Sequence, residues 1–130
     1  PADAARALVD RGARLVVAKL GSRGALAVTR EGAVEIPVVP IVAIDPTGAG
    51  DAFCGGFLAA LARTGNAVAA ACCGAVSASF AVERFGCLGL LEATRGEALP
   101  RLRALTSFLP AAARDALGGL LSDTGADCDA

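Results

Sequence analysis

The chain has 130 residues and a formal net charge of −1, with 12 basic and 13 acidic side chains. This length fits one domain with one core, and the basic residues are scattered, so they form no basic stripe for a nucleic-acid backbone. Histidine is absent, which excludes Ser-His-Asp and Cys-His catalysis within the chain and leaves acid–base chemistry to carboxylates.

The first half of the chain predicts one helix and a series of short strands. Alanine and leucine at helical spacing, with charges between them, predict a helix over residues 2–11. Short β-branched or apolar runs bounded by turn residues predict four successive strands, over residues 14–20, 25–29, 33–37 and 38–44. The last strand is expected to lead into a loop at Asp45, because Pro46 biases the residue before it toward an extended conformation.

A long helix is predicted over residues 49–63, with Phe53 and Phe57 one turn apart on the same face. Gly55 and Gly56 in its interior each cost about 1 kcal/mol relative to alanine. Their presence indicates that another backbone or a ligand approaches the helix closely at this point.

A second helix is predicted over residues 67–84, capped by Asn66 and apolar nearly all round, which favours a buried position. Its apolar run is mostly alanine and falls short of the ~20 strongly apolar residues of a membrane helix, so we expect no membrane span. A capping-box pattern at residues 94–97 precedes a third predicted helix over residues 98–108. The small, polar residues from about 118 to 130 are expected to fray.

The cysteines have no C-x-x-C spacing, and most lie in alanine-rich helical patterns, where a thiol behaves as a small apolar group. They are Cys54, Cys72, Cys73, Cys87 and Cys128. The pattern predicts reduced core cysteines in a cytoplasmic protein.

The most informative stretch is D-P-T-G-A-G-D at residues 45–51, which joins an apolar run to the start of a helix. The amides of Gly48, Ala49 and Gly50 have little side-chain cover, and amides that open a helix have no partner four residues back. They therefore suit an anion such as a phosphate group. Two interpretations of Asp51 stay open: it complements the helix dipole beside a plain turn, or it is a base beside bound phosphate.

This loop and two further segments together resemble the carboxyl half of the ribokinase-like (PfkB) family of carbohydrate and nucleoside kinases. The segments read K-L-G-S-R-G at residues 19–24, D-P-T-G-A-G-D-A-F-C-G-G-F-L at residues 45–58 and A-V-E-R-F-G at residues 81–86. The resemblance covers about the first two thirds of the chain, and the combination is more specific than a lone glycine-rich loop.

The resemblance implies an α/β, Rossmann-like sheet flanked by helices, with the site at the carboxyl end of the strand that leads to Asp45. In the family, the first signature, the substrate-binding residues and the lid lie upstream of these segments. The chain also begins at Pro1 without a methionine. We therefore expect residues 1–130 to be the C-terminal nucleotide-binding and catalytic-base part of a PfkB-type kinase domain, lacking the substrate and lid half.

The resemblance also implies roles for individual residues. Asp51 is the implied general base, which takes the proton from the acceptor hydroxyl. The implied anion hole consists of the amides of Gly48, Ala49 and Gly50. The implied nucleotide-binding residues are Lys19, Leu20, Gly21, Ser22, Arg23 and Gly24. Taken alone, this last segment could equally be a hairpin turn preceded by a solvent-exposed lysine.

ATP and Mg²⁺ are the implied cofactors, although the family's Mg²⁺ ligands mostly lie upstream. Family members often hold a monovalent cation, for which K⁺ is the candidate, and the matching positions here are Asp45, Thr47 and Gly86. On their own, Asp45 could equally cap a turn and Gly86 could end a helix.

The implied function is ATP-dependent phosphotransfer to a hydroxyl group of a sugar or related small molecule. The alternatives are a nucleoside kinase of the adenosine type and a noncatalytic nucleotide-binding fragment, and the retained Asp51 disfavours the second. A dinucleotide-binding G-x-G-x-x-G and a Walker loop are both missing from the sequence. We expect no nucleic-acid or membrane partner, and the family allows a homodimer.

Overall fold

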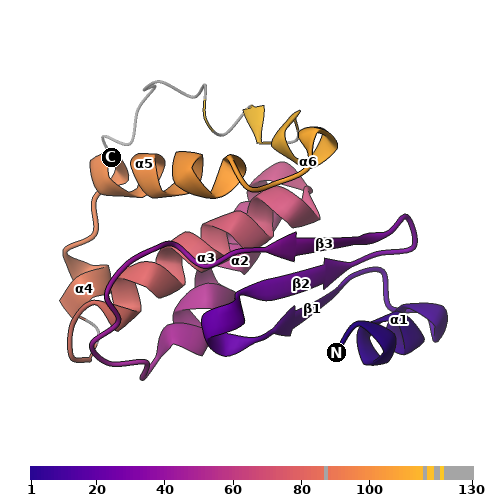
Figure 1. The fold of residues 1–130 in the computed structure, drawn as a ribbon, viewed down its shortest axis with the longest axis horizontal. Coiled ribbons are helices and arrows are strands. Elements are labelled where there is room, and N and C mark those ends of the chain that lie inside the picture. The colour runs from indigo at the N-terminus through magenta and orange to yellow at the C-terminus, as the bar shows by residue number, and fades with distance from the viewer. Residues whose placement is uncertain (87, 116, 119–120, 122–130) are drawn as a thin grey trace.

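The computed structural model describes residues 1–86, 88–115, 117, 118 and 121, which form a small sheet with helices packed around it (Figure 1). The strands are β1 (Val16–Lys19), β2 (Ala25–Val28) and β3 (Ala33–Ile36). They lie in the order β1-β2-β3, each antiparallel to its neighbour. The prediction of a sheet flanked by helices is confirmed.

All four residues of β2 are buried, and since successive strand residues point to opposite sides, both faces of this central strand are covered. Val28 of β2 packs with Val9 of helix α1 (Ala2–Asp10) on one face. Ile36 of β3 belongs to the larger core on the other face, which includes much of helix α3 (Ala67–Val82). The short sheet is therefore covered by α1 on one side and by the main helical layer on the other.

The prediction of a fourth strand over residues 38–44 is wrong. No strand follows β3 among the described residues; the segment is irregular, and Val42 within it is 82% exposed. Pro37 and Pro40 have no backbone N–H to donate to a neighbouring strand. A strand with proline in its interior is therefore found only at the edge of a sheet or at a bulge. Apolar composition alone therefore suggested a strand where the chain lacks the hydrogen bonding to make one.

The end of this irregular segment is attached to helix α3. The amides of Ile44 and Asp45 both donate to the carbonyl oxygen of Val82, at 2.7 and 3.1 Å. Val82 is the last residue of α3. The loop that begins at Asp45 is thus positioned by the end of helix α3. The sequence had led us to expect the carboxyl end of a strand in that place.

Helix α2 (Ala49–Thr64) is followed directly by α3, and the two pack against each other along their lengths. Helix α2 ends at Gly65, which adopts a left-handed conformation with φ of 64°. Asn66 then caps α3, and its side-chain oxygen accepts a hydrogen bond from the Ala69 amide at 2.9 Å. Both predicted helices and the predicted Asn66 cap are confirmed, with boundaries within the usual one or two residues.

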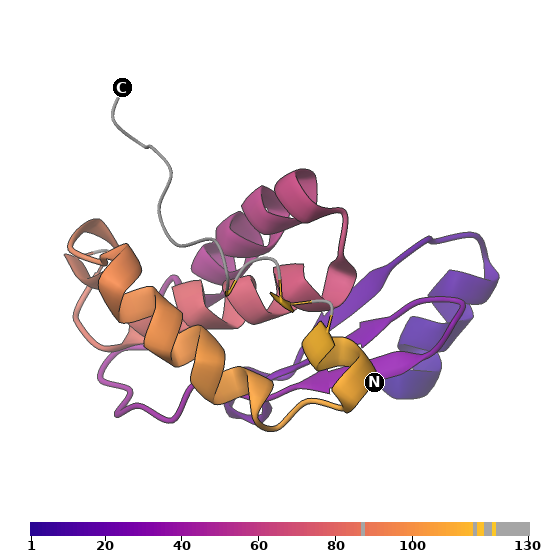
Figure 2. The same ribbon diagram turned by 90° about the horizontal axis from the view of Figure 1, so that it is seen from above.

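Helix α3 lies between α2 and helix α5 (Arg95–Thr106) (Figure 2). Its small residues are buried nearly all round, which confirms the expectation of a buried apolar helix. Helix α5 begins at the predicted capping box, in which Glu97 and Thr94 bond reciprocally to each other's backbone amides.

Two further helices, α4 (Leu88–Leu91) and α6 (Ala111–Asp115), were not predicted. Each is too short to show a helical period in the sequence. Most of the tail that was expected to fray, including all of residues 122–130, lies outside the described residues. Within the described part of the chain, no helix has the length and apolarity required to cross a bilayer.

The two interior glycines of α2 have different surroundings. A Cβ atom built on Gly56 would lie 2.2 Å from Ser77 Oγ and 3.0 Å from the carbonyl oxygen of Cys73, both on α3. A Cβ atom on Gly55 would have no neighbour within 4 Å. The close backbone approach inferred from the pair is therefore confirmed at Gly56. No other backbone approaches Gly55 among the described residues, and the alternative of a ligand there stays a prediction.

This contrast provides a matched pair of substitutions. We expect Gly56→Ala to lower the free energy of unfolding by about 1–3 kcal/mol, because α2 and α3 must separate to admit the methyl group. Gly55→Ala should raise it by about 0.5–1 kcal/mol through helix propensity alone. Urea unfolding followed by circular dichroism measures both changes, and equal effects of the two substitutions would contradict the packing described here.

Candidate active site

The loop at residues 45–51 opens helix α2 through a left-handed residue. Gly48 has φ of 79° and immediately precedes the helix. The amide of Ala49 donates to the carbonyl oxygen of Pro46 at 3.2 Å, so this donor already has a partner. Among the described residues, no acceptor is found for the amides of Gly48, Gly50 or Asp51. The helix start therefore presents unpaired donors at its positive end, while anion binding itself stays a prediction.

Asp51 lies in the first turn of α2 and is exposed. Its carboxylate makes no hydrogen bond or ion pair with the part of the chain that the structure describes. An acid without an internal partner, on the same helical turn as unpaired amides, is accessible to a proton donor bound next to those amides.

Lys19 joins the two segments that the sequence singled out. From the end of β1, its Nζ donates to the carbonyl oxygen of Gly50 at 3.1 Å and to Cys54 Sγ at 3.5 Å. A Cβ atom on Gly50 would lie 3.0 Å from this Nζ, so the ammonium group would have to shift slightly to admit a side chain there. The ammonium group thus lies beside a helix start that is itself positive, and the two together attract an anion.

Residues 20–24 form a tight turn between β1 and β2. The amide of Leu20 donates to Gly24 at 2.8 Å, and the amide of Gly24 donates back to Gly21 at 3.0 Å, around a short 3₁₀ helix (Gly21–Arg23). Gly24 has φ of 85°, and a Cβ atom there would lie 2.1 Å from the carbonyl oxygen of Ile36. The hairpin interpretation is confirmed, and Gly24 is required by the approach of β3. No such contact limits Gly21, which has open space around it.

Asp45, Thr47 and Gly86 come together, as the sequence resemblance implies. Asp45 Oδ1 accepts a hydrogen bond from the Thr47 amide at 2.9 Å. The pKa of Asp45 is lowered from 3.8 mainly by hydrogen bonding from the Thr47 side chain and amide, with a smaller contribution from the amide of Gly86; burial acts weakly in the opposite direction. Gly86, with φ of 66°, lies in the turn after α3 and not at the helix end itself.

The expectation that the cysteines lie in the core is confirmed for Cys72 and wrong for Cys54. Cys72 is buried, and burial, together with the neighbouring Cys73, raises its pKa to about 12. Burial also raises the pKa of Cys73, with Arg63 opposing the shift.

Cys54 is exposed and contacts Lys19, a contact that sequence reasoning missed. One signal was available: Cys54 lies one helical turn after Gly50 and so shares its face. The two remaining cysteines lie outside the described residues.

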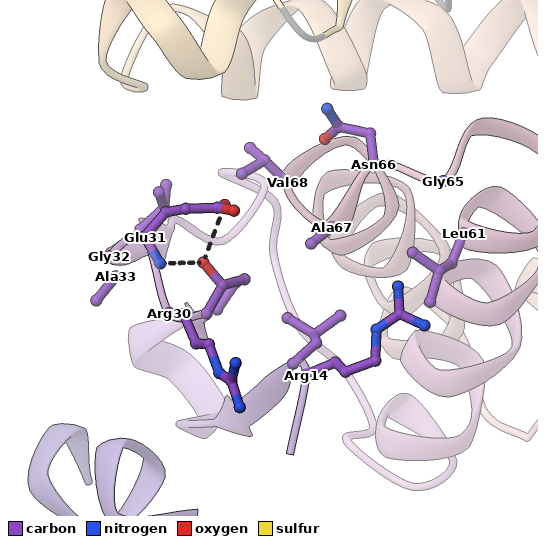
Figure 3. Close-up of a pocket in the computed structure, with 14 residues that line it drawn as sticks. Arg14, Arg30, Glu31, Gly32, Ala33, Leu61, Gly65, Asn66, Ala67 and Val68 are labelled. Carbon is purple, nitrogen blue, oxygen red and sulfur yellow. Dashed lines mark hydrogen bonds between the residues drawn. The ribbon is translucent and has the colours of Figure 1, made fainter. Parts of the chain in front are cut away.

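A cavity of about 1250 Å³ lies away from this loop. It opens between the β2–β3 turn, which contributes Arg30 and Glu31, and the α2–α3 connection, which contributes Asn66 (Figure 3). Arg14 before β1 projects along its edge (Figure 3). None of the predicted site residues lines it. Sequence reasoning did not predict this cavity, because its walls come from turns that are far apart along the chain.

No group of three or more histidine, cysteine, aspartate or glutamate side chains that could hold a metal ion occurs within the described residues. The two aspartates of the loop, Asp45 and Asp51, are the carboxylates that the structure places at this site. Oxygen atoms of this kind suit hard cations such as K⁺ and Mg²⁺.

Comparisons with known proteins agree with the sequence resemblance. The profile of a family described as "pfkB family carbohydrate kinase" matches residues 1–94. A deoxyribokinase from Salmonella typhi is 39% identical over 79 residues, which make up 61% of this chain and 26% of the relative. The chain therefore spans about a quarter of the length of such curated relatives.

Solved structures show the same relationship. Aminoimidazole riboside kinase from Salmonella enterica, in complex with aminoimidazole riboside and an ATP analogue, superposes with a TM-score of 0.66 and 30% identity, over 78% of this chain and 35% of that one. Phosphofructokinase-2 from Escherichia coli, in complex with potassium, superposes with a TM-score of 0.70 and 25% identity, over 81% of this chain and 33% of that one. The predicted ribokinase-like fold is confirmed.

The contrast between the cysteines leads to a direct test. At about pH 8, iodoacetamide should modify Cys54 rapidly and Cys72 only after unfolding, because the thiolate is the reactive form and burial keeps Cys72 protonated and covered. Peptide mass spectrometry over a time course, with and without denaturant, measures both rates. Cys54→Ser is the control that should remove the fast reaction; similar rates for the two thiols in the folded protein would contradict the structure.

Proposed function

The chain belongs to the pfkB family of carbohydrate kinases, and from that premise we propose that it takes part in ATP-dependent transfer of a phosphoryl group to a hydroxyl of a sugar or related small molecule. We propose further that residues 1–130 are the C-terminal nucleotide-binding and catalytic-base part of such a kinase domain. The share of its relatives that the chain spans, about a third of the solved structures, supports this assignment.

The single observation that carries the proposal is the convergence at the start of α2. Unpaired amides, the Asp51 side chain and the contact points of the Lys19 ammonium group all lie within the first two turns of one helix. Phosphoryl transfer needs mainly positioning and electrostatic stabilisation, with a base to receive the hydroxyl proton. This helix start supplies donors for phosphate oxygens and an acceptor for that proton.

In the proposed reaction, the Asp51 carboxylate takes the proton from the attacking hydroxyl as the new O–P bond forms. The bond between the γ-phosphorus of ATP and its bridging oxygen breaks, and ADP leaves. The amides of Gly48 and Gly50 stabilise charge on the transferring phosphoryl group, and Lys19 adds a positive charge beside them. The segment from Leu20 to Gly24 would line the nucleotide. The weakest donor of the proposed anion hole is Ala49, because its amide already bonds to Pro46.

ATP and Mg²⁺ are the proposed cofactors, with K⁺ as a further cation. When bound, Mg²⁺ neutralises charge on the β- and γ-phosphates, and it commonly uses substrate phosphates in place of a full protein cage. The carboxylate of Asp45, with oxygen atoms of Thr47 and Gly86, would hold K⁺ and keep the loop in place. The hydrogen bonds that lower the pKa of Asp45 also hold its carboxylate in the loop, beside Thr47 and Gly86.

Two alternatives differ in the acceptor and in the chemistry. A nucleoside acceptor has support from a nucleoside kinase of Methanocaldococcus jannaschii, which is 40% identical over 80 residues. A noncatalytic nucleotide-binding role would not require a base, and the exposed Asp51 beside the amides argues against it.

We also propose a cytoplasmic location, because free thiols such as Cys54 persist in reducing compartments. A homodimer stays a prediction.

Replacement of the proposed base tests the function directly. Asp51→Asn should lower the rate of ADP release with an acceptor sugar or nucleoside by ~10²- to 10⁴-fold or more, because no group remains to take the proton. ATP affinity, measured by calorimetry, should stay close to that of the unchanged protein. Asp10→Asn, at the exposed end of α1, is the matched control and should alter neither quantity. Equal loss of binding and transfer in a folded Asp51→Asn protein would count against the base.

The proposed cation site has its own test. K⁺ should raise the melting temperature relative to the same concentration of tetramethylammonium, and Asp45→Asn should abolish the difference. Because the pKa of Asp45 is lowered from 3.8, the K⁺ effect should persist as the pH falls and disappear only below that value, where the carboxylate is protonated. Loss of the effect near neutral pH, or its survival in Asp45→Asn, would show that the cation binds elsewhere.

A further inference from the structure

Arg101 on helix α5 makes a three-way contact with the end of helix α3. Its Nη1 donates to Ser79 Oγ at 2.8 Å, and its Nη2 donates to Glu83 Oε2 at 2.6 Å. The guanidinium carbon lies 3.8 Å from the centre of the Phe80 ring. A planar guanidinium that uses two donors and one face at once is held in a single orientation.

This contact is partly shielded from solvent. The Arg101 and Glu83 side chains are 19% and 32% exposed, whereas a second ion pair on the same turn, Arg84 with Glu92, has side chains that are 57% and 59% exposed. Exposed pairs are screened by water and contribute little. The described residues thus contain two ion pairs between the end of α3 and the segment after it. Only the pair of Arg101 with Glu83 is shielded enough to constrain the backbone.

Glu83 directly follows Val82, the residue that anchors the loop at residues 44–51. The carbonyl oxygen of Val82 receives the amides of Ile44 and Asp45. Asp45 in turn binds the Thr47 amide and lies beside Gly86. Glu83 is therefore one residue away from the acceptor that holds Ile44 and Asp45, where the loop that opens α2 begins.

We propose that Arg101 and Glu83 are positioning residues: helix α5 holds the turn after α3 in place through them and thereby sets the position of the loop at residues 44–51. As a statement about catalysis, this rests on the proposed function. Arg101 lies beyond residues 1–94, the part of the chain that the family profile matches, and Figure 2 shows α5 running alongside α3. A helix outside the matched segment thus supports the site.

Amide hydrogen exchange on the 130-residue chain tests the local claim without any substrate. In Arg101→Met, which keeps an apolar side chain against Phe80, exchange at the Ile44 and Asp45 amides should rise at least ~10-fold more than at the Thr29 amide, which bonds within the β2–β3 turn. Arg84→Met is the matched control, and its Ile44 and Asp45 amides should exchange as in the unchanged protein. Arg101→Lys should restore protection only in part, because an ammonium cannot reproduce the forked contact.

Glu83→Ala is the second variant and decides the question alone if Arg101→Met does not fold. It leaves Arg101 on Phe80 and Ser79, and it should again raise exchange selectively at Ile44 and Asp45. A uniform rise at all three amides, or no rise at Ile44 and Asp45, would overturn the proposal, because Arg101 would then contribute only to global stability.

Calorimetry with ATP separates this proposal from the proposed function. If the unchanged chain binds ATP, selective loosening should weaken binding about 10-fold or more in Arg101→Met and leave it unaltered in Arg84→Met. If the unchanged chain binds no ATP but the exchange pattern holds, the positioning role stands and the function proposed for this chain fails. If ATP binds and the exchange pattern is missing, the function stands and the positioning role is wrong.

Discussion

The geometry of the candidate site depends on one carbonyl oxygen, that of Val82, which accepts hydrogen bonds from two successive amides of the loop. The chain before this point is irregular and partly exposed, so it could not hold the loop by itself. Helix α3, by contrast, is buried on most sides. A backbone acceptor at the end of a buried helix is a rigid anchor, because moving it would disturb a close-packed core.

Two glycines contribute to this rigidity, because they allow α2 and α3 to pack closely. Gly56 brings α2 against α3 so closely that a methyl group would meet Ser77, and Gly74 does the same opposite Phe53. Because α2 carries Asp51 and α3 carries the Val82 anchor, this contact fixes the two halves of the site relative to each other. Both glycines lower intrinsic helix propensity, and the packing they permit offsets that cost.

Charges of both signs lie at the start of α2, where the Lys19 ammonium group approaches the loop that carries Asp45 and Asp51. Lys19 reaches across from the sheet and places an ammonium group where the helix dipole is already positive. A cation at a helix start is unfavourable for the helix itself, and here it is held by the carbonyl oxygen of Gly50 and by Cys54 Sγ. Asp51, in the first turn of α2, has the sign of charge that complements the helix dipole.

Sequence reasoning succeeded where the decisive contacts are local. The Asn66 cap, the capping box at Thr94 and the termination at Gly65 each involve residues within one helical turn, so the sequence contained all the partners. It failed at residues 38–44, because whether an apolar run becomes a strand depends on hydrogen-bonding partners supplied from elsewhere. It also missed the exposure of Cys54, since a helical period shows that two residues share a face but not which way that face points.

The sequence by itself determined the class of the protein and the chemistry available to it: a loop of bare amides, a carboxylate beside them, and a family signature that relates the two. Only the tertiary structure decided how these parts are held, through the Val82 anchor, the Lys19 bridge and the contact of Arg101 with Glu83. The physical reason is that a motif specifies local backbone geometry, whereas these three contacts join residues from different elements and exist only once the core has packed.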